Sequence, residues 1–144
     1  MTSPCVCTTI RKANRALFRF YEQSMAEAEL SVVQFAILRS LERNGAMPLS
    51  RIADEQAMER TSLYRTIAPL LETGAIRLRD ADRGKAKIAT LTRSGIRLIR
   101  RSLPYWQAAQ QAVVTQLGEE DWDRLSKVIL DIPAMLDAAE TPGG

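Results

Sequence analysis

The 144-residue sequence contains no histidine and only two cysteines, Cys5 and Cys7. Histidine is the commonest metal ligand and general base, so its absence argues against zinc sites, Ser-His-Asp triads and Cys-His dyads. The two cysteines are too close in sequence to form a useful structural disulfide. The sequence also lacks a glycine-rich dinucleotide motif, a P-loop and an HExxH motif. We therefore expect no enzymatic activity, no metal and no cofactor.

Long apolar runs are missing as well. No stretch approaches the roughly 18 apolar residues that a membrane helix needs, so no membrane partner is expected. The N-terminus lacks a basic start followed by an apolar segment, which argues against a signal peptide and favours a cytoplasmic location. Hydrophobic residues make up 46% of the chain and charged residues 26%. This composition is typical of a globular protein with a real core.

Charge is unevenly distributed along the chain. Residues 77–101 contain nine basic and two acidic residues, a net charge of +7, whereas residues 102–144 contain two basic and seven acidic residues, a net charge of −5. A basic middle segment indicates a polyanionic partner. A solvated cationic surface explains the same pattern equally well from charge alone.

Apolar spacing predicts four helices in the first half of the chain. The first follows a cap at Thr8 or Thr9 and extends to about residue 29. A capping box formed by Ser31 and Gln34 opens the second, which ends at residues 44–45. The third covers residues 49–57 and the fourth covers residues 60–73, with Gly74 ending it.

A β-hairpin and two further helices are predicted in the second half. Residues 75–79 and 85–91 alternate like strands around a turn at 80–84. At this turn Asp82 is expected to form an ion pair that orients Arg83. Thr92 is expected to cap a helix over 93–117 that Pro104 bends. A last helix over 119–137 is expected to be bent or shortened by Pro133.

This order predicts a mainly α protein with a small β-hairpin wing, that is, a winged helix-turn-helix. We expect an N-terminal dimerisation helix in residues 1–30, the DNA-binding domain in residues 31–92 and C-terminal dimerisation helices in residues 93–144. The flanking helices have apolar faces with no other core to join. A second copy of the chain would bury them, which predicts a homodimer.

The second helix of a helix-turn-helix enters the major groove of double-stranded DNA near its own N-terminus. The residues expected to contact DNA from this helix are Arg60, Thr61, Ser62, Tyr64 and Arg65. From the wing they are Arg83, Lys85 and Lys87, which suit phosphates or an adjacent minor groove. The alternatives are helix capping by the two hydroxyls, a half-buried tyrosine and a solvated charged hairpin.

Four stretches together give the chain a resemblance to MarR-type transcriptional regulators: residues 30–38, residues 60–65 followed by 70–74, residues 80–85, and residues 91–95. The resemblance covers nearly the whole length and implies a triangular homodimer on a pseudo-palindromic operator. The two recognition helices would then lie about 34 Å apart. It also implies a repressor that a small, often phenolic or aromatic, ligand releases from DNA.

Three residues depart from the family pattern. Ala57 stands where glycine is common before the recognition helix, which leaves the shape of that turn open. Glu59 replaces the more usual Asp or Ser cap. Pro69 lies inside the recognition helix, where it removes the hydrogen bond to the Arg65 carbonyl and is expected to bend the helix.

Two mechanisms of release remain open from the sequence. In the first, an effector enters a pocket lined by the first, second and fifth helices. The candidate residues there are Arg15, Phe18, Arg19, Phe35 and Tyr105. An arginine in this pocket would pair with a carboxylate. The alternative for these residues is ordinary core packing of the aromatics and surface positions for the arginines.

In the second mechanism, Cys5 or Cys7 senses oxidants. A reactive thiol needs exposure and a lowered pKa, which nearby Arg11, Lys12 and a helix N-terminus would provide. Ordinary apolar packing is the alternative for both cysteines. A third interpretation, a helical interaction module with no role in DNA binding, does not explain the predicted wing.

Overall fold

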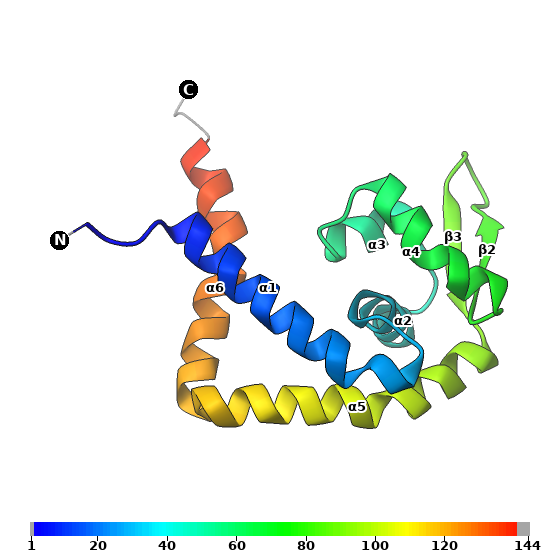
Figure 1. The fold of residues 1–144 in the computed structure, drawn as a ribbon. Coiled ribbons are helices and arrows are strands. Elements are labelled where there is room, and N and C mark those ends of the chain that lie inside the picture. Colours follow the sequence, from blue (N-terminus) through cyan, green and yellow to red (C-terminus); the bar gives the residue numbers. More distant parts are fainter. Residues whose placement is uncertain (1, 141–144) are drawn as a thin grey trace. The chain divides into compact units, whose positions relative to one another are not determined.

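The computed structural model describes residues 2–140. Within this range the chain forms α-helices, one short 3-10 helix and three strands (Figure 1). Their bounds are α1 (Val6–Ser24), η1 (Ala26–Ala28), α2 (Val32–Asn44), β1 (Met47–Pro48), α3 (Leu49–Glu55), α4 (Arg60–Glu72), β2 (Ile76–Asp80), β3 (Lys87–Leu91), α5 (Arg93–Leu117) and α6 (Glu119–Glu140). This order confirms the predicted winged helix-turn-helix.

The chain divides into two compact units, one up to Ala108 and the other from Ala109 on, with the boundary inside α5. The first unit holds α1 to α4, the sheet and the start of α5. The amino-acid sequence instead divides the chain by expected role, into residues 1–30, 31–92 and 93–144. That division stays a prediction. Positions 1 and 141–144 of the two outer segments lie outside the described residues.

Helix α1 begins earlier than the sequence pattern predicts. Cys5 is its N-cap, so neither Thr8 nor Thr9 caps it. The Thr9 hydroxyl instead donates a hydrogen bond to the Cys5 carbonyl at 2.8 Å. Threonine makes this bond to the residue four positions back when it lies inside a helix.

The predicted signals around α2 are confirmed. The Gln34 N–H donates to the Ser31 hydroxyl at 3.0 Å, and the Ser31 N–H donates to the Gln34 side chain at 3.0 Å. The helix stops at Gly45, whose φ of 76° lies in the left-handed region that favours glycine. Helix α2 lies in the middle of the first unit and contacts α1, α4 and β3 (Figure 1).

The wing belongs to a three-stranded antiparallel sheet in the order β1-β3-β2, where the sequence predicts only a two-stranded hairpin. Met47 of β1 pairs with Ala89, and Ile76 of β2 pairs with Leu91. Strand β1 has two residues and includes Pro48, so it carries no alternation that a sequence pattern could reveal. It ties the segment before α3 to the base of the wing.

Thr92 caps α5 as predicted, because its hydroxyl accepts a hydrogen bond from the Gly95 N–H at 3.1 Å. Gly118 separates α5 from α6, with a φ of 88°. Pro133 does not shorten α6, which continues to Glu140. Pro133 lacks the N–H that would donate one hydrogen bond within the helix. The residues before and after it are nevertheless helical.

The hydrophobic core of the first unit draws on every element from η1 to the start of α5. Its largest fully buried side chains are Met25, Ile37, Leu38, Leu41, Met47, Ile52, Leu63, Ile67, Ile76 and Ile99. Because α3 and α4 both pack into this core, the exposed face of α4 is held on a rigid base. None of the described helices is both long and apolar enough to cross a bilayer.

Candidate nucleic-acid interface

Helix α4 has one buried face and one exposed face. Leu63, Ile67 and Leu70 point into the core. The side chains predicted to contact DNA are all exposed and lie in the first half of the helix: Arg60, Thr61, Ser62, Tyr64 and Arg65. Tyr64 is 48% exposed, so its ring and hydroxyl are accessible from outside the protein. The helix therefore presents a charged and polar N-terminal half.

The turn into α4 contains a strained residue. Ala57 has a φ of 50°, a left-handed conformation that favours glycine over alanine. The turn is held by hydrogen bonds from the Ala57 N–H to the Asp54 carbonyl at 3.1 Å and from the Met58 N–H to the Ala53 carbonyl at 2.8 Å. These bonds fix the direction in which the chain leaves α3 and enters α4, although alanine stands in place of glycine.

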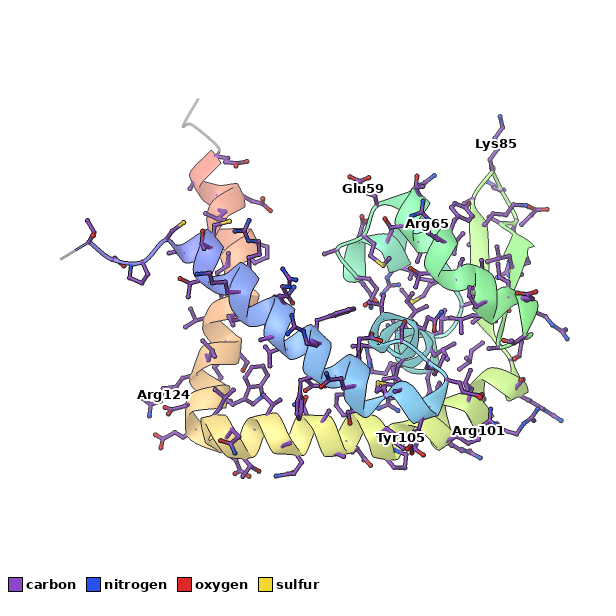
Figure 2. The ribbon with its side chains drawn as sticks, in the orientation of Figure 1. Glu59, Arg65, Lys85, Arg101, Tyr105 and Arg124 are labelled. Atoms are coloured by element: carbon purple, nitrogen blue, oxygen red, sulfur yellow. The ribbon has the colours of Figure 1, made fainter. Side chains whose placement is uncertain are left out.

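Glu59 is the N-cap of α4, so neither Thr61 nor Ser62 occupies that position. Within the described residues the Glu59 side chain makes no capping hydrogen bond. Its negative charge suits the helix dipole at this end. Figure 2 shows Glu59 at the head of α4, on the same side of the unit as Arg65. An approaching phosphate would therefore meet one like charge among several cations.

The wing ends in a basic tip between β2 and β3. The Ala81 N–H donates to the Ala86 carbonyl at 2.9 Å, and Gly84 takes a φ of 82° at the turn. Arg83 and Lys85 are exposed there, and Lys85 marks the apex in Figure 2. The expected ion pair between Asp82 and Arg83 is not among the ion pairs of residues 2–140. Arg83 thus has no ion-pair partner among the residues that the structure describes.

Lys87 differs from the two tip residues because it is paired within the wing. Lys87 faces Asp80 across the two strands and forms an ion pair with it. The hydrogen bond and charge of the Lys87 ammonium lower the pKa of Asp80, and Asp80 raises the pKa of Lys87 in return. Any stabilisation from the lowered pKa is present at neutral pH and is lost as the pH falls through the Asp80 pKa. Both groups are exposed, so the contribution is small.

A polar junction connects the end of α4, the wing and α5. The Thr92 hydroxyl donates to the Gly74 and Ala75 carbonyls at 2.6 and 3.0 Å, and its own N–H donates to the Ala75 carbonyl at 3.1 Å. Gly95 packs beneath Ala75, where an added Cβ would lie only 2.2 Å from that carbonyl oxygen. The threonine and the glycine therefore set the position of the wing relative to α4.

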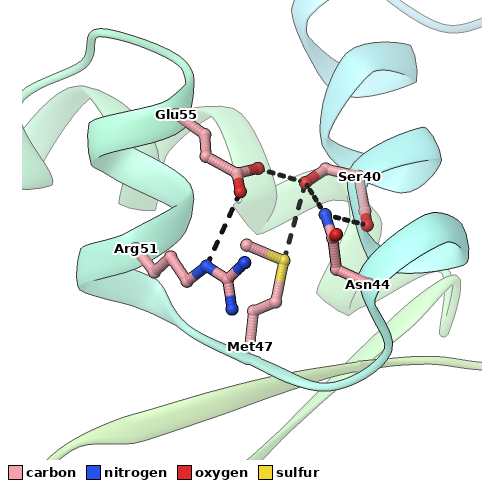
Figure 3. A network of polar contacts seen from close by, with 5 residues as sticks. All are labelled: Ser40, Asn44, Met47, Arg51 and Glu55. Atoms are coloured by element: carbon pink, nitrogen blue, oxygen red, sulfur yellow. Dashed lines mark hydrogen bonds and ion pairs between the residues drawn. The ribbon is translucent and has the colours of Figure 1, made fainter.

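A second polar network, which the sequence did not reveal, holds α3 against α2 (Figure 3). The buried Ser40 hydroxyl hydrogen-bonds to the Glu55 carboxylate and lies 3.5 Å from the Met47 sulfur. Asn44 donates to the Ser40 carbonyl at 3.0 Å, and Arg51 Nε lies 3.6 Å from the Glu55 carboxylate. The network joins α2, β1 and α3, and α3 in turn packs against α4.

The residues predicted to bind an effector have unequal environments in the first unit. Arg15, Phe18 and Arg19 are exposed on α1. Phe35 is 2% exposed and stacks on Trp106 with ring centroids 5.9 Å apart, which makes it a core residue. Tyr105 is half-buried, and its carbonyl accepts a hydrogen bond from Ser24 at 2.9 Å. A shared pocket for these five residues stays a prediction.

Both cysteines are exposed free thiols at the start of α1. The pKa of Cys5 lies below its ordinary value, chiefly because the Thr8 backbone N–H and then the Thr8 side chain donate hydrogen bonds to it. The helix N-terminus thus lowers the Cys5 pKa, and neither Arg11 nor Lys12 contributes. No group of three or more His, Cys, Asp or Glu side chains that could hold a metal ion occurs within residues 2–140.

Solved structures with a similar fold are transcriptional regulators. MosR of M. tuberculosis in complex with DNA is 26% identical, with a TM-score of 0.82, and the match covers 95% of this chain and 99% of that chain. A mutant of E. coli MarR complexed with operator DNA is 15% identical, with a TM-score of 0.77, and the match covers 88% of this chain and 92% of that chain.

A third similar structure is BpsR of Bordetella bronchiseptica, whose DNA binding is regulated by 6-hydroxynicotinic acid. It is 18% identical, with a TM-score of 0.79, and the match covers 89% of this chain and 98% of that chain. At such identities the likeness to MarR and BpsR is one of fold. No protein-family model and no curated protein matches the sequence.

Proposed function

We propose that the chain is a MarR-type winged helix-turn-helix protein and a sequence-specific transcriptional repressor that acts as a homodimer. It acts in the cytoplasm on double-stranded DNA with a pseudo-palindromic operator, and a small ligand releases it. Its role is regulatory and involves no catalysis. The structural likeness to MosR over almost the full length of both chains supports this proposal.

One observation carries the DNA-binding part of the proposal. The exposed half of α4 and the basic tip of the wing lie at the same end of the first unit, where Figure 2 shows Arg65 and Lys85. Arginine forks suit guanine edges and phosphates, and the wing arginine suits a narrow minor groove. Arg83 and Lys85 have no acidic partner among residues 2–140, so their charges are available to phosphates.

Fluorescence anisotropy with the DNA flanking the protein's own gene tests this proposal. A scrambled duplex of the same length and composition is the control, and each is measured at two salt concentrations. The expected result is tight binding that weakens with salt and favours the native sequence. Equal and weak binding to both duplexes would support the helical interaction module instead.

Exposed apolar side chains support the homodimer. On α1 they include Val6, Ile10, Leu17, Phe18 and Phe20, and on α6 they include Leu125, Val128, Ile129, Leu130, Met135 and Leu136. Monomeric proteins seldom leave such apolar helix faces in water. A second copy of the same chain would cover them, as in a two-fold symmetric dimer.

An aromatic acid is the ligand class that we propose for release. Phe18 and Tyr105 offer aromatic contacts, and Arg15 or Arg19 offers a partner for a carboxylate. The effect of 6-hydroxynicotinic acid on BpsR supports the same ligand class. Titrating phenolic and hydroxynicotinic acids into the protein–DNA complex tests it. Release by the acid but not by its neutral amide is expected if an arginine pairs with the carboxylate.

Thiol-based sensing is the second candidate, because Cys5 combines full exposure with a lowered pKa. Such a thiol reacts with peroxide faster than an ordinary cysteine. Peroxide is expected to release the wild-type protein from DNA but not the Cys5→Ser/Cys7→Ser variant. Release that persists in this variant would exclude the redox mechanism.

A further inference from the structure

Four arginines occupy one face of the first turns of α5: Arg93, Arg97, Arg100 and Arg101. Steps of three and four residues place them on the same side of the helix. All four are exposed, and none makes an ion pair or a side-chain hydrogen bond within residues 2–140. We call this set the arginine face. Neighbouring like charges destabilise a helix, so the face carries an uncompensated repulsion.

The arginine face borders a hollow in the protein surface. Ser94, Arg97, Arg100 and Arg101 line an open depression of about 460 Å³. Three of its four lining residues are arginines, so the depression carries a strong positive charge. The depression suits a small and highly charged anion.

The arginine face is separate from the proposed DNA-binding surface. Figure 2 shows Arg101 on α5 at the end of the first unit away from Arg65 and Lys85. Strand β3 and the junction at Thr92 lie between the wing tip and α5 in the chain. A duplex held by α4 and the wing tip therefore leaves the arginine face open to another ligand.

We propose that the arginine face binds a small polyanion that carries two or more phosphate groups. Guanidinium groups form paired hydrogen bonds with phosphate oxygens, a geometry that lysine does not offer. A phosphate monoester carries about −1.5 to −2 charges at neutral pH, so two or three phosphates match the total charge of the four arginines. Carboxylates of equal total charge need more groups and more volume. The site goes beyond the proposed function, and its occupation does not depend on DNA binding.

Calorimetric titration of the full chain with sodium tripolyphosphate tests the proposal, with sodium chloride of equal ionic strength as the reference. Wild-type protein is expected to bind one tripolyphosphate per chain. Arg97→Ala/Arg101→Ala is expected to weaken binding by at least about tenfold, because charge-assisted hydrogen bonds are lost. Arg97→Lys/Arg101→Lys keeps the charge and is expected to give an intermediate affinity.

Two charge-matched double variants distinguish this site from general attraction. Arg11→Ala/Lys12→Ala on α1 and Arg83→Ala/Lys85→Ala on the wing remove the same charge elsewhere, and both are expected to bind tripolyphosphate as the wild type does. No binding above the chloride reference would overturn the proposal. So would an equal loss in the wing variant, or a tenfold loss of duplex binding in Arg97→Ala/Arg101→Ala. Failure of the wild type to bind DNA would not alter the tripolyphosphate result.

Discussion

Helices α4 and α6 are similarly amphipathic, and each contains an internal proline, but they differ in what they bury. Helix α4 buries Leu63, Ile67 and Leu70 and contacts α2, α3 and β2. None of the described residues of α6 is buried, and Leu130 is 76% exposed. The same kind of amphipathic pattern therefore gives a helix packed into the core in one case and a helix with an exposed apolar face in the other.

The difference shows what an amphipathic pattern specifies. The pattern identifies the face of a helix that gains free energy on burial, but it does not identify the partner. The partner of α4 lies in the same chain, because α2, α3 and the sheet surround it. Among the described residues, the apolar side chains of α6 stay exposed, and we propose that a second copy covers them.

The largest expected effect comes from truncating a buried residue of α4. Leu63→Ala is expected to lower the free energy of unfolding by about 2–5 kcal/mol, because it removes buried methyl groups and leaves a cavity. Urea denaturation in dilute protein measures this loss. At protein concentrations where the chain is monomeric, Leu130→Ala removes the same atoms from an exposed site and is expected to change the value by less than about 0.5 kcal/mol. Equal losses for the two variants would erase the contrast between the helices.

The proposed role of the α6 face predicts an effect on assembly. Val128→Asp/Leu136→Asp is expected to raise the dimer dissociation constant at least about 100-fold, because both carboxylates would be buried in an apolar interface. Sedimentation equilibrium measures the constant. Thr115→Asp/Gln116→Asp adds the same charge at exposed polar positions of α5 and serves as the control. A double aspartate variant that dimerises normally would exclude α6 from the interface.

The tip of the wing and the start of strand β3 are expected to differ in their effect on DNA binding. Arg83→Ala is expected to weaken binding by more than about 1 kcal/mol and to reduce the salt slope by about one phosphate contact. Lys87→Ala is expected to have a smaller effect, because Lys87 is paired with Asp80. Anisotropy titrations over a range of salt concentrations measure both. A larger effect for Lys87 would mean that the pair with Asp80 breaks when DNA binds.

A smaller effect is expected at the turn before α4. Ala57→Gly is expected to raise the free energy of unfolding by about 0.5–1 kcal/mol, because glycine adopts the left-handed conformation without steric cost. Ala112→Gly, at an exposed position inside α5, is the control and is expected to destabilise the protein by a similar amount. Urea denaturation measures both, and a loss of stability in Ala57→Gly would show that the turn is not strained.

The lowered pKa of Cys5 predicts a pH effect on reactivity with no large change in stability. In the Cys7→Ser variant, alkylation of Cys5 by iodoacetamide is expected to be half-maximal below the ordinary thiol pKa of about 8.5, because the thiolate persists to lower pH. Thr8→Val removes the side-chain hydrogen bond and is expected to shift the midpoint upward. A midpoint at or above the ordinary value would contradict the stabilisation of the thiolate by the helix N-terminus.

Local signals in the sequence were sufficient to predict much of the fold. The capping box of α2, the glycine stops after α2 and α4, and the Thr92 cap each depend on residues only a few positions apart. The exposure of the predicted residues on α4 follows from helical periodicity in the same way. Their contacts with DNA stay a prediction.

Features that depend on distant pairings could not be predicted. Strand β1 exists because Met47 meets Ala89, and the bond between Ser40 and Glu55 spans two helices. In the wing, the sequence neighbour Asp82 was expected to pair with Arg83, but the cross-strand register instead places Asp80 beside Lys87. The polar character of these residues was visible in the sequence, whereas their partners were set by tertiary packing.

Hydroxyl-radical footprinting of the protein on the DNA flanking its own gene tests the central claim most directly. A homodimeric winged helix-turn-helix is expected to protect two half-sites whose centres lie about one helical turn, roughly 34 Å, apart. The protection should disappear in Val128→Asp/Leu136→Asp at concentrations where this variant is monomeric. A single protected half-site, or protection that the monomeric variant retains, would contradict a regulator that reads DNA as a dimer.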